Sequence, residues 1–247
     1  MLRLEKLVKR FGGVVATDGV SLEIASGEVH ALIGPNGAGK TTLIGQICGS
    51  LRPDAGRIFF EEHDITSLPQ HARVRAGLAR SFQLTSLFGR FTVLDNLALA
   101  VQARSGSSFS FWKPVVSERE LFDQALSILE MIGLSQKRNL PAAALAHGEQ
   151  RALELGLALA TQPRLVLLDE PMAGMGPDES ERMLGLVERI RGRVTVLLVE
   201  HDMDAVFRLA QRISVLVSGR IIATGLPDEI RKSAQVRRAY LGEEVPA

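Results

Sequence analysis

One glycine-rich segment has the residue types and the spacing of a loop that binds phosphate groups. Residues 34–42, Gly-Pro-Asn-Gly-Ala-Gly-Lys-Thr-Thr, match the pattern G-x-x-x-x-G-K-[ST]. Glycines in such a loop allow backbone angles and close approaches that a Cβ atom would block. Lys40 is expected to reach the β- and γ-phosphates of a nucleotide, and the Thr41 hydroxyl is expected to bind Mg²⁺. The residues expected around the phosphates are Gly34, Pro35, Asn36, Gly37, Ala38, Gly39, Lys40, Thr41 and Thr42.

The segments on either side of this loop support the same interpretation. Residues 29–33, Val-His-Ala-Leu-Ile, predict a short buried strand, and residues 41–47 predict the start of a helix. A strand–loop–helix order points a helix N-terminus at the phosphates, where the helix dipole and free N–H groups favour anions. A chance glycine-rich turn would not need these flanks, so the sequence predicts a nucleoside triphosphate site.

A second segment ends in two neighbouring carboxylates. Residues 165–170, Leu-Val-Leu-Leu-Asp-Glu, predict an apolar strand with acids at its C-terminal end. Beside a phosphate loop, that edge of a sheet is where Mg²⁺ needs a second protein anchor. Asp169 is therefore expected to hold the metal, and Glu170 to polarise an attacking water as the general base. The plainer alternative is a strand that merely ends in acids.

Composition limits the remaining possibilities. The 247 residues suit one large α/β domain or a domain with a subdomain, and a hydrophobic content of 46% argues against intrinsic disorder. A net charge of +1 gives no electrostatic sign of nucleic acid binding. Cys48 is the only cysteine, which excludes an intramolecular disulfide and favours a reducing compartment. No secretory signal and no apolar run of about 18 residues is found, so we expect any membrane association to be peripheral.

Apolar patterning predicts strands alternating with helices, except for a middle region that predicts helices alone. Strands are expected at residues 2–8, 20–24, 29–33, 57–60, 165–168, 194–199, 213–217 and 221–224, the last two as a hairpin. Helices are expected at 92–101, with Thr92 as cap, and at 118–132. A further helix is expected to end at residue 160, another to begin at residue 177, and a last one to run from about 227 to 242. A serine-rich linker at 104–114 carries Phe109, Phe111 and Trp112, which either pack under their own loop or contact a partner.

A third segment, Leu-Ala-His-Gly-Glu-Gln at residues 145–150, opens a helix ahead of the acidic strand. In the order and spacing of these motifs, the chain resembles the ATP-binding cassette (ABC) ATPases over essentially its whole length. Residues 34–42 match the Walker A motif of that family, and residues 165–170 match its Walker B motif. Residues 145–150 match the signature motif, through which one cassette contacts the ATP held by another.

Three single residues extend the resemblance. Gln83 matches the Q-loop glutamine, which the family uses in catalysis and near the metal. His201 matches the switch histidine, and it follows an apolar strand that should neighbour the phosphate-loop strand, which would aim its side chain at the γ-phosphate. Phe11 takes the place of the aromatic residue that stacks on adenine.

The resemblance implies an α/β P-loop NTPase of the ABC ATPase type, with an N-terminal antiparallel β region and an inserted α-helical subdomain. Residues 1–83 and 161–247 would form the core with its β subdomain, and residues 84–160 the helical subdomain. ATP and Mg²⁺ would lie between two cassettes, so the signature residues would contact the partner's ATP. These residues are Ala146, His147, Gly148 and Glu149.

Four departures from the family pattern affect contacts to the partner's nucleotide. Ala146 replaces the usual serine, and His147 replaces the first glycine of the signature. Glu149 stands where glutamine is usual, and Gly176 stands where the D-loop normally has aspartate. The residues that bind the chain's own nucleotide are intact, so the departures put only the strength of the other half of the site in doubt.

Within the family, several segments look like those of the ATP-binding subunits of branched-chain amino-acid importers. They are residues 9–13, 145–148, 170–175 and 239–243, and urea and short-amide importers share these traits. The resemblance implies two transmembrane permease subunits, a second and distinct cassette, and indirectly an extracytoplasmic substrate-binding protein. It places the chain at the cytoplasmic face of the bacterial inner membrane, with no nucleic acid partner.

Two rival functions are weighed against transport. A soluble cassette ATPase acting on ribosomes or DNA would need two cassettes, a basic arm or a coiled coil, and the sequence has none. A non-catalytic, ATP-responsive regulatory subunit is argued against by the intact Walker residues and His201, while Ala146 and Gly176 keep it open.

Overall fold

The computed structural model describes residues 1–81, 87–105 and 116–241. The chain forms two compact units, one of residues 1–76 with 191–247 and the other of residues 77–190. These bounds do not coincide with the expected helical subdomain at 84–160, which stays a prediction. Gln83 and the linker aromatics Phe109, Phe111 and Trp112 lie outside the described residues.

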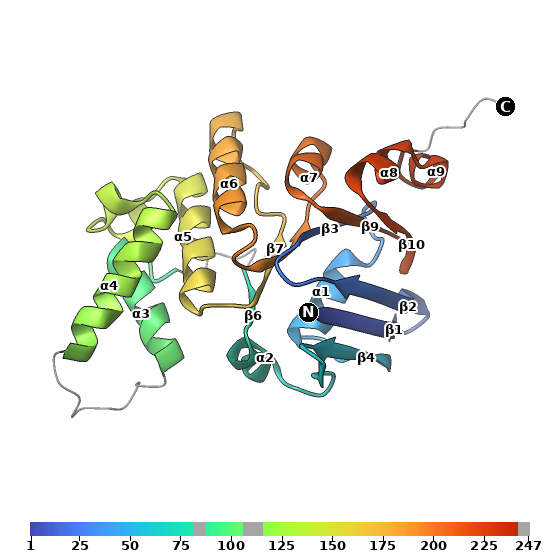
Figure 1. Cartoon of the computed structure of the whole chain (residues 1–247), viewed down its shortest axis with the longest axis horizontal. Coiled ribbons are helices and arrows are strands. Elements are labelled where there is room, and N and C mark those ends of the chain that lie inside the picture. Colours follow the sequence, from blue (N-terminus) through green and yellow to red (C-terminus); the bar gives the residue numbers. More distant parts are fainter. Residues whose placement is uncertain (82–86, 106–115, 242–247) are drawn as a thin grey trace. The chain divides into compact units, whose positions relative to one another are not determined.

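The first unit begins with an antiparallel sheet (Figure 1). Its strands are β1 (Leu2–Phe11), β2 (Val14–Ile24), β4 (Ala55–Phe60) and β5 (His63–Asp64), in the order β2-β1-β4-β5. Residues 2, 4 and 7 of β1 are buried leucines, as expected for a strand with one face on the core. The predicted N-terminal antiparallel β region is confirmed.

A set of mainly parallel strands in the same unit carries the phosphate loop. Strand β3 (Val29–Ile33) pairs in parallel with β8 (Thr195–Val199) and with β9 (Arg212–Val217). Strand β10 (Arg220–Gly225) returns antiparallel to β9, as the predicted hairpin. Every residue of β3 and β8 is buried, which agrees with strands covered on both faces. The prediction that the strand before His201 neighbours the phosphate-loop strand is confirmed.

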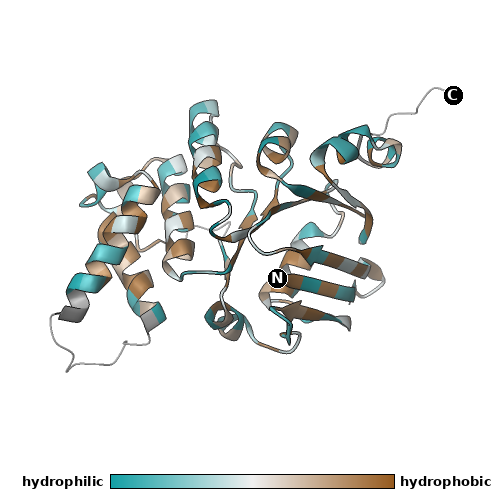
Figure 2. Ribbon diagram, viewed as in Figure 1, coloured by the Kyte–Doolittle hydropathy of each residue, from teal (hydrophilic) through white to brown (hydrophobic). Residues whose placement is uncertain are grey.

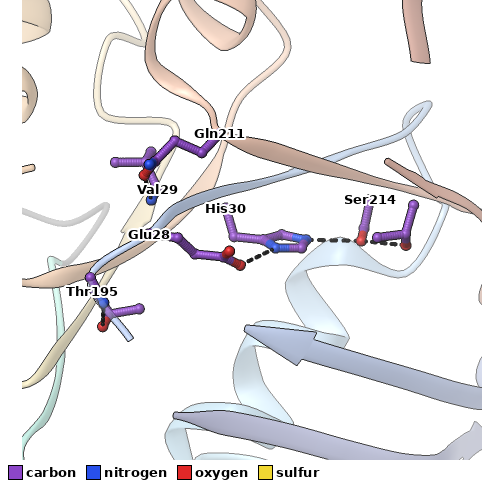
Figure 3. A network of polar contacts seen from close by, with 8 residues as sticks. Glu28, Val29, His30, Thr195, Gln211 and Ser214 are labelled. Carbon is purple, nitrogen blue, oxygen red and sulfur yellow. Dashed lines mark hydrogen bonds and ion pairs between the residues drawn. The ribbon is translucent and has the colours of Figure 1, made fainter. Parts of the chain in front are cut away.

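A polar network fixes the register of β3 against its neighbours (Figure 3). The buried His30 ring lies with Nδ1 2.8 Å from Glu28 Oε1 and Nε2 2.9 Å from Ser214 Oγ, which in turn lies 2.7 Å from Thr224 Oγ1. Burial raises the pKa of the Glu28 carboxyl, but its hydrogen bonds with His30 and the Ala25 backbone more than offset this, and the pKa is lowered. A satisfied network of this kind holds β3 in one place relative to β9 and β10.

The helices of the first unit are α1 (Lys40–Cys48), α2 (Gln70–Ala76), α7 (Met203–Leu209), α8 (Pro227–Lys232) and α9 (Ala234–Leu241). The expected single helix after residue 227 is wrong, because Ser233 is extended and separates α8 from α9. The Ser233 hydroxyl accepts from the Val236 N–H at 3.4 Å, so this serine starts a new helix.

The second unit contains a parallel pair of strands and the helical region. The strands are β6 (Leu78–Arg80) and β7 (Leu165–Asp169). Thr92 precedes the first helix, and its hydroxyl accepts from the Asp95 N–H at 3.0 Å, which confirms the predicted cap. Among the described residues, no helix is both long and apolar enough to span a bilayer. The helices are α3 (Val93–Ser105), α4 (Val116–Met131), α5 (His147–Ala160) and α6 (Pro177–Ile190), with single 3-10 turns η1 (Ser135–Lys137) and η2 (Ala142–Ala144).

Helices α4 and α6 bury the apolar faces that their sequences predict. Met183, Leu186, Val187 and Ile190 of α6 are all buried, and brown hydrophobic residues alternate with teal hydrophilic ones along this helix (Figure 2). On α5, a Cβ at Gly156 would lie 2.8 Å from the Ile132 side chain, so this glycine permits close packing against the segment after α4.

A buried arginine closes the C-terminal end of the phosphate-loop helix. Arg73 of α2 is 1% exposed, and burial lowers the pKa of its guanidinium. Its Nη1 donates to the carbonyls of Gln46 at 2.6 Å and Ile47 at 2.7 Å, at the end of α1. Nε donates to Leu68 O at 3.0 Å and Nη2 to Thr66 O at 3.0 Å. A cation at a helix C-terminus is favourable, so Arg73 ties α1 to α2.

Replacing Arg73 with methionine should lower the free energy of unfolding by about 3 kcal/mol, because the carbonyls that accept from its guanidinium lose a charged donor. Arg75→Met, on the exposed face of the same helix, is the matched control and should change stability little. Urea denaturation followed by circular dichroism measures both. Equal midpoints for the two variants would contradict this role of Arg73.

Candidate nucleotide-binding site

The phosphate loop joins β3 to α1, as predicted (Figure 1). Gly39 has φ +105°, in the region that favours glycine. A Cβ at Gly39 would lie 2.2 Å from Ala16 O of β2, and one at Gly34 would lie 2.1 Å from Leu216 O of β9. The loop backbone is therefore packed directly against two strands, and only glycine fits at these positions.

The lysine of the loop is folded back over the loop itself. Lys40 Nζ donates to Gly34 O at 2.6 Å and to Pro35 O at 3.1 Å, so its charge is held inside the curve of the backbone. Helix α1 has no side-chain cap at its N-terminus, where Thr41 is exposed. A positive charge and uncapped N–H groups at one helix N-terminus form a site that fits polyphosphate.

Phe11 stands at the tip of the β1–β2 hairpin, opposite Val14. Its side chain is 48% exposed, and the Lys9 ammonium lies 5.6 Å from the ring centroid. Because β2 passes the phosphate loop at Ala16, the hairpin tip lies a few residues from that loop along the same strand. An exposed aromatic there can stack on a base, and its role in adenine binding stays a prediction.

His201 lies two residues after the end of β8, with its side chain 63% exposed. The adjacent Glu200 side chain is 1% exposed, and its Oε2 accepts from the backbone N–H groups of His201 at 3.0 Å and Asp202 at 3.4 Å. His201 Nδ1 lies 3.7 Å from the same oxygen. Asp202 then caps α7 by accepting from Asp204 N and Ala205 N. Glu200 thus orients the histidine segment.

Glu200 was not predicted as a functional residue. The signal was present, because Glu200 is an acid at the C-terminal end of a buried strand next to the phosphate-loop strand. The same pattern predicted Asp169, whereas after β8 only His201 was predicted as functional.

In the second unit, Asp169 is the last residue of β7, with its side chain 3% exposed. Its Oδ2 accepts from Arg80 Nη2 at 2.8 Å, an ion pair between the ends of the adjacent strands β6 and β7. Arg80 was not predicted. The next residue, Glu170, has φ +50°, which is uncommon for a residue with a side chain. Strained backbone of this kind gathers at functional sites.

The two expected magnesium ligands, Thr41 and Asp169, each have the chemistry that this ion needs. Mg²⁺ usually keeps several waters and takes one or two protein oxygens together with phosphate oxygens. The described residues contain no group of three or more His, Cys, Asp and Glu that could hold a metal ion. Thr41 of the first unit and Asp169 of the second unit each carry a hard oxygen atom of the kind that Mg²⁺ takes, and their binding of one ion stays a prediction.

The signature segment forms the start of α5. Ala146 is the N-cap residue and offers no side-chain acceptor. Glu149 Oε2 accepts from the Ala146 N–H at 3.1 Å, and Lys137 pairs with the other carboxylate oxygen. Burial raises the pKa of the Glu149 carboxyl, but these two partners more than offset it and the pKa is lowered. Glu149 therefore stabilises the start of the helix, and its contact with a partner's ATP stays a prediction.

The D-loop, residues 173–176, lies beside the signature segment within the second unit. A Cβ at Gly174 would lie 3.6 Å from His147 Nε2. His147 and Ala146 are exposed, and Gly148 is partly buried. The structure thus brings the signature and D-loop together, and it places Asp169 and Glu170 in the same unit. Lys40, Phe11 and His201 belong to the first unit.

Comparison with known proteins finds relatives over almost the whole chain. Residues 17–173 match the ABC transporter family, and residues 220–246 match a family described as branched-chain amino acid ATP-binding cassette transporter. The chain is 40% identical to the high-affinity branched-chain amino acid transport ATP-binding protein LivG of Salmonella typhimurium over 98% of each chain. It is 36% identical to the lipopolysaccharide export system ATP-binding protein LptB of Escherichia coli, again over 98% of each.

Solved structures agree with the sequence relatives. The ADP conformation of MJ1267, an ATP-binding cassette of an ABC transporter, superposes with a TM-score of 0.84 at 32% identity, covering 98% of this chain and 99% of that one. The α/β P-loop fold and the family resemblance drawn from the motifs are confirmed. The chain belongs to the ABC transporter family, as an ATPase cassette whose hydrolysis of ATP is coupled to transport.

Proposed function

We propose that this chain is the ATP-hydrolysing subunit of an importer for branched-chain or other hydrophobic amino acids. The observation that carries the proposal is the 40% identity to LivG along the whole chain. The match at residues 220–246 supports it separately, because this segment lies beyond the general ABC match at 17–173. The C-terminal segment therefore supports the branched-chain amino acid subfamily, and not only the fold.

In the proposed reaction, the uncapped start of α1 and Lys40 bind the β- and γ-phosphates and offset the charge on the transferred phosphoryl group. Thr41 and Asp169 would hold Mg²⁺, which would neutralise charge on the phosphate oxygens. Glu170 takes a proton from the attacking water.

Three further residues complete the chain's own half of the site. Phe11 stacks on the adenine and His201 contacts the γ-phosphate. Gln83 takes part in catalysis and lies near the metal. Glu200 holds the backbone of the His201 segment, so it acts through that histidine. The signature residues serve the ATP bound by a second cassette.

The partners follow from the same proposal. Two transmembrane permease subunits bind this cassette and a second, distinct one, and an extracytoplasmic binding protein delivers the substrate to the permeases. The cassettes then lie at the cytoplasmic face of the bacterial inner membrane, as peripheral subunits.

The relatives bear on the substrate. LptB is nearly as similar to this chain as LivG, although its name assigns it to lipopolysaccharide export. Cassette similarity alone thus spans different substrates, and substrate choice belongs to the permeases and the binding protein. An importer for urea or short amides is the alternative within the same architecture.

Purification of the tagged chain from detergent-solubilised membranes tests the proposal. Two permeases and a second cassette should co-purify. The complex in proteoliposomes should import leucine when ATP is supplied on the side of the membrane where the cassettes lie. Import of urea with no import of leucine would favour the alternative. Absence of any permease in the purified material would contradict the transport role of this chain.

A weakly catalytic regulatory cassette is the second candidate, and one observation favours it. Ala146 offers no side-chain hydroxyl to a partner's nucleotide, and Gly176 offers no side chain to a partner. A steady-state ATPase assay on the assembled complex, with and without Glu170→Gln in this chain alone, separates the two. If this chain were a regulatory subunit, Glu170→Gln would leave the ATP turnover of the complex unchanged.

A further inference from the structure

A carboxylate from α6 covers the N-terminus of the signature helix. Glu179 Oε1 accepts from the Gly148 N–H at 3.1 Å. Its other oxygen, Oε2, lies 3.4 Å from the N atom of Gly176 in the D-loop and accepts from that N–H. One side chain therefore bridges the two segments that the family resemblance directs toward a partner's nucleotide.

Close packing shows that this contact is built into the fold. A Cβ at Gly148 would lie 2.8 Å from Glu179 Cδ and from Oε1, and 3.0 Å from Glu179 Cβ. Any residue other than glycine at position 148 would push the carboxylate away. The glycine thus leaves space that the Glu179 side chain fills.

The contact also explains how α5 manages without a capping side chain. The first N–H groups of a helix need acceptors, and the N-cap residue Ala146 supplies none from its side chain. Glu179 supplies one from outside the helix, where the dipole of α5 favours a negative charge. Glu179 also lies in the first turn of α6, so two helix N-termini stabilise the same carboxylate.

We propose that Glu179 is a positioning residue that occupies the anion site of the signature helix until the γ-phosphate of a partner cassette displaces it. This inference rests on the proposed function, in which that helix start receives ATP from a second cassette. The carboxylate and the phosphate are both anions and compete for the Gly148 N–H. Glu179 therefore opposes closure of the cassette pair.

Displacement of Glu179 also affects the D-loop. The other oxygen of the same carboxylate accepts from the Gly176 N–H, so movement of the Glu179 side chain away from Gly148 also changes the contact that holds Gly176. Arrival of the partner's phosphate at the signature helix is thereby linked to movement of the D-loop. A single side chain couples the two trans elements of the site.

Glu179→Gln tests this role, because the amide oxygen can still accept from Gly148 while the charge is removed. In a Glu170→Gln background, sedimentation velocity over a range of concentrations measures self-association with and without ATP. We expect half-association with ATP at a concentration about tenfold lower than for the parent. Without ATP the two proteins should behave alike.

Asp178→Asn is the matched control. Asp178 is the neighbouring residue in the first turn of α6, is exposed, and carries the same charge. It should leave ATP-driven association unchanged. Glu179→Ala removes charge and acceptor together, so it should also promote association while lowering the melting temperature.

Three outcomes overturn the inference: no difference between Glu179→Gln and the parent, weaker association of Glu179→Gln, or an equal gain from Asp178→Asn. Binding of a fluorescent ATP analogue to each protein, measured separately, distinguishes this failure from a failure of the proposed function. If no variant binds the analogue, the proposed function fails. If all bind it and association does not change, only the role of Glu179 fails.

Discussion

Replacing Glu170 with glutamine should lower steady-state ATP hydrolysis by at least about a hundredfold while Mg-ATP still binds, since a general base is worth that much or more. Glutamine keeps the size of the side chain but cannot accept the proton of the attacking water. The left-handed backbone at this position is occupied by a non-glycine residue already, so the change introduces no new backbone strain. Phosphate release and equilibrium binding of a fluorescent ATP analogue measure the two effects.

Two further variants sharpen this test. Lys40→Ala should abolish hydrolysis and also weaken nucleotide binding, because the loop loses the charge that it holds over its own carbonyls. Asp178→Asn, an exposed acid in the same unit, should hydrolyse ATP like the parent. Turnover by Glu170→Gln at the parental rate would show that Glu170 is not the base.

Much of the fold could be predicted because its strands are local patterns. Apolar runs predicted the bounds of β3 without error and those of β8 within one residue, because strands buried on both faces consist mainly of apolar residues. The hairpin of β9 and β10 followed from the turn at Ser218-Gly219, where both residues have positive φ.

One part that was missed depends on contacts distant in sequence, and another depends on the backbone of a single residue. Helix α2 is short and rich in arginine and histidine, and its burial rests on Arg73 reaching carbonyls of α1 that lie 26 and 27 residues earlier. The break between α8 and α9 turns on the backbone of one serine, Ser233, within a sequence that permits a continuous helix.

The candidate site divides in the same way. The phosphate loop and the acidic strand end are contiguous motifs, so their residues could be named in advance. Arg80 meets Asp169 across 89 positions, and Glu179 meets Gly148 across 31. No periodicity in the sequence marks such pairs. An arginine or glutamate on a surface helix or at a strand end looks the same in the sequence whether or not it has a partner in the fold.

The missing hydroxyl at Ala146 leads to the other large effect. A signature serine would offer a hydroxyl, backbone N–H groups and a helix dipole to a partner's γ-phosphate, whereas this chain keeps only the last two. One hydrogen bond to a charged oxygen contributes roughly 1.5–3 kcal/mol, or about ten- to a hundredfold in affinity. Gly176 removes a further side chain from the interface. At micromolar concentration the chain alone should therefore remain a monomer with ATP and hydrolyse it slowly.

Ala146→Ser should restore the contact and strengthen ATP-driven self-association by about ten- to a hundredfold. Ala144→Ser is the control, since this exposed alanine lies outside the signature and should change nothing. Light scattering of each variant in the Glu170→Gln background, with and without ATP, measures the effect. A distinct cassette that carries its own signature serine should raise turnover at the Lys40 site within the permease complex. A tight ATP-dependent homodimer of the parent at micromolar concentration would contradict this account, because the two departures at Ala146 and Gly176 would then be without consequence.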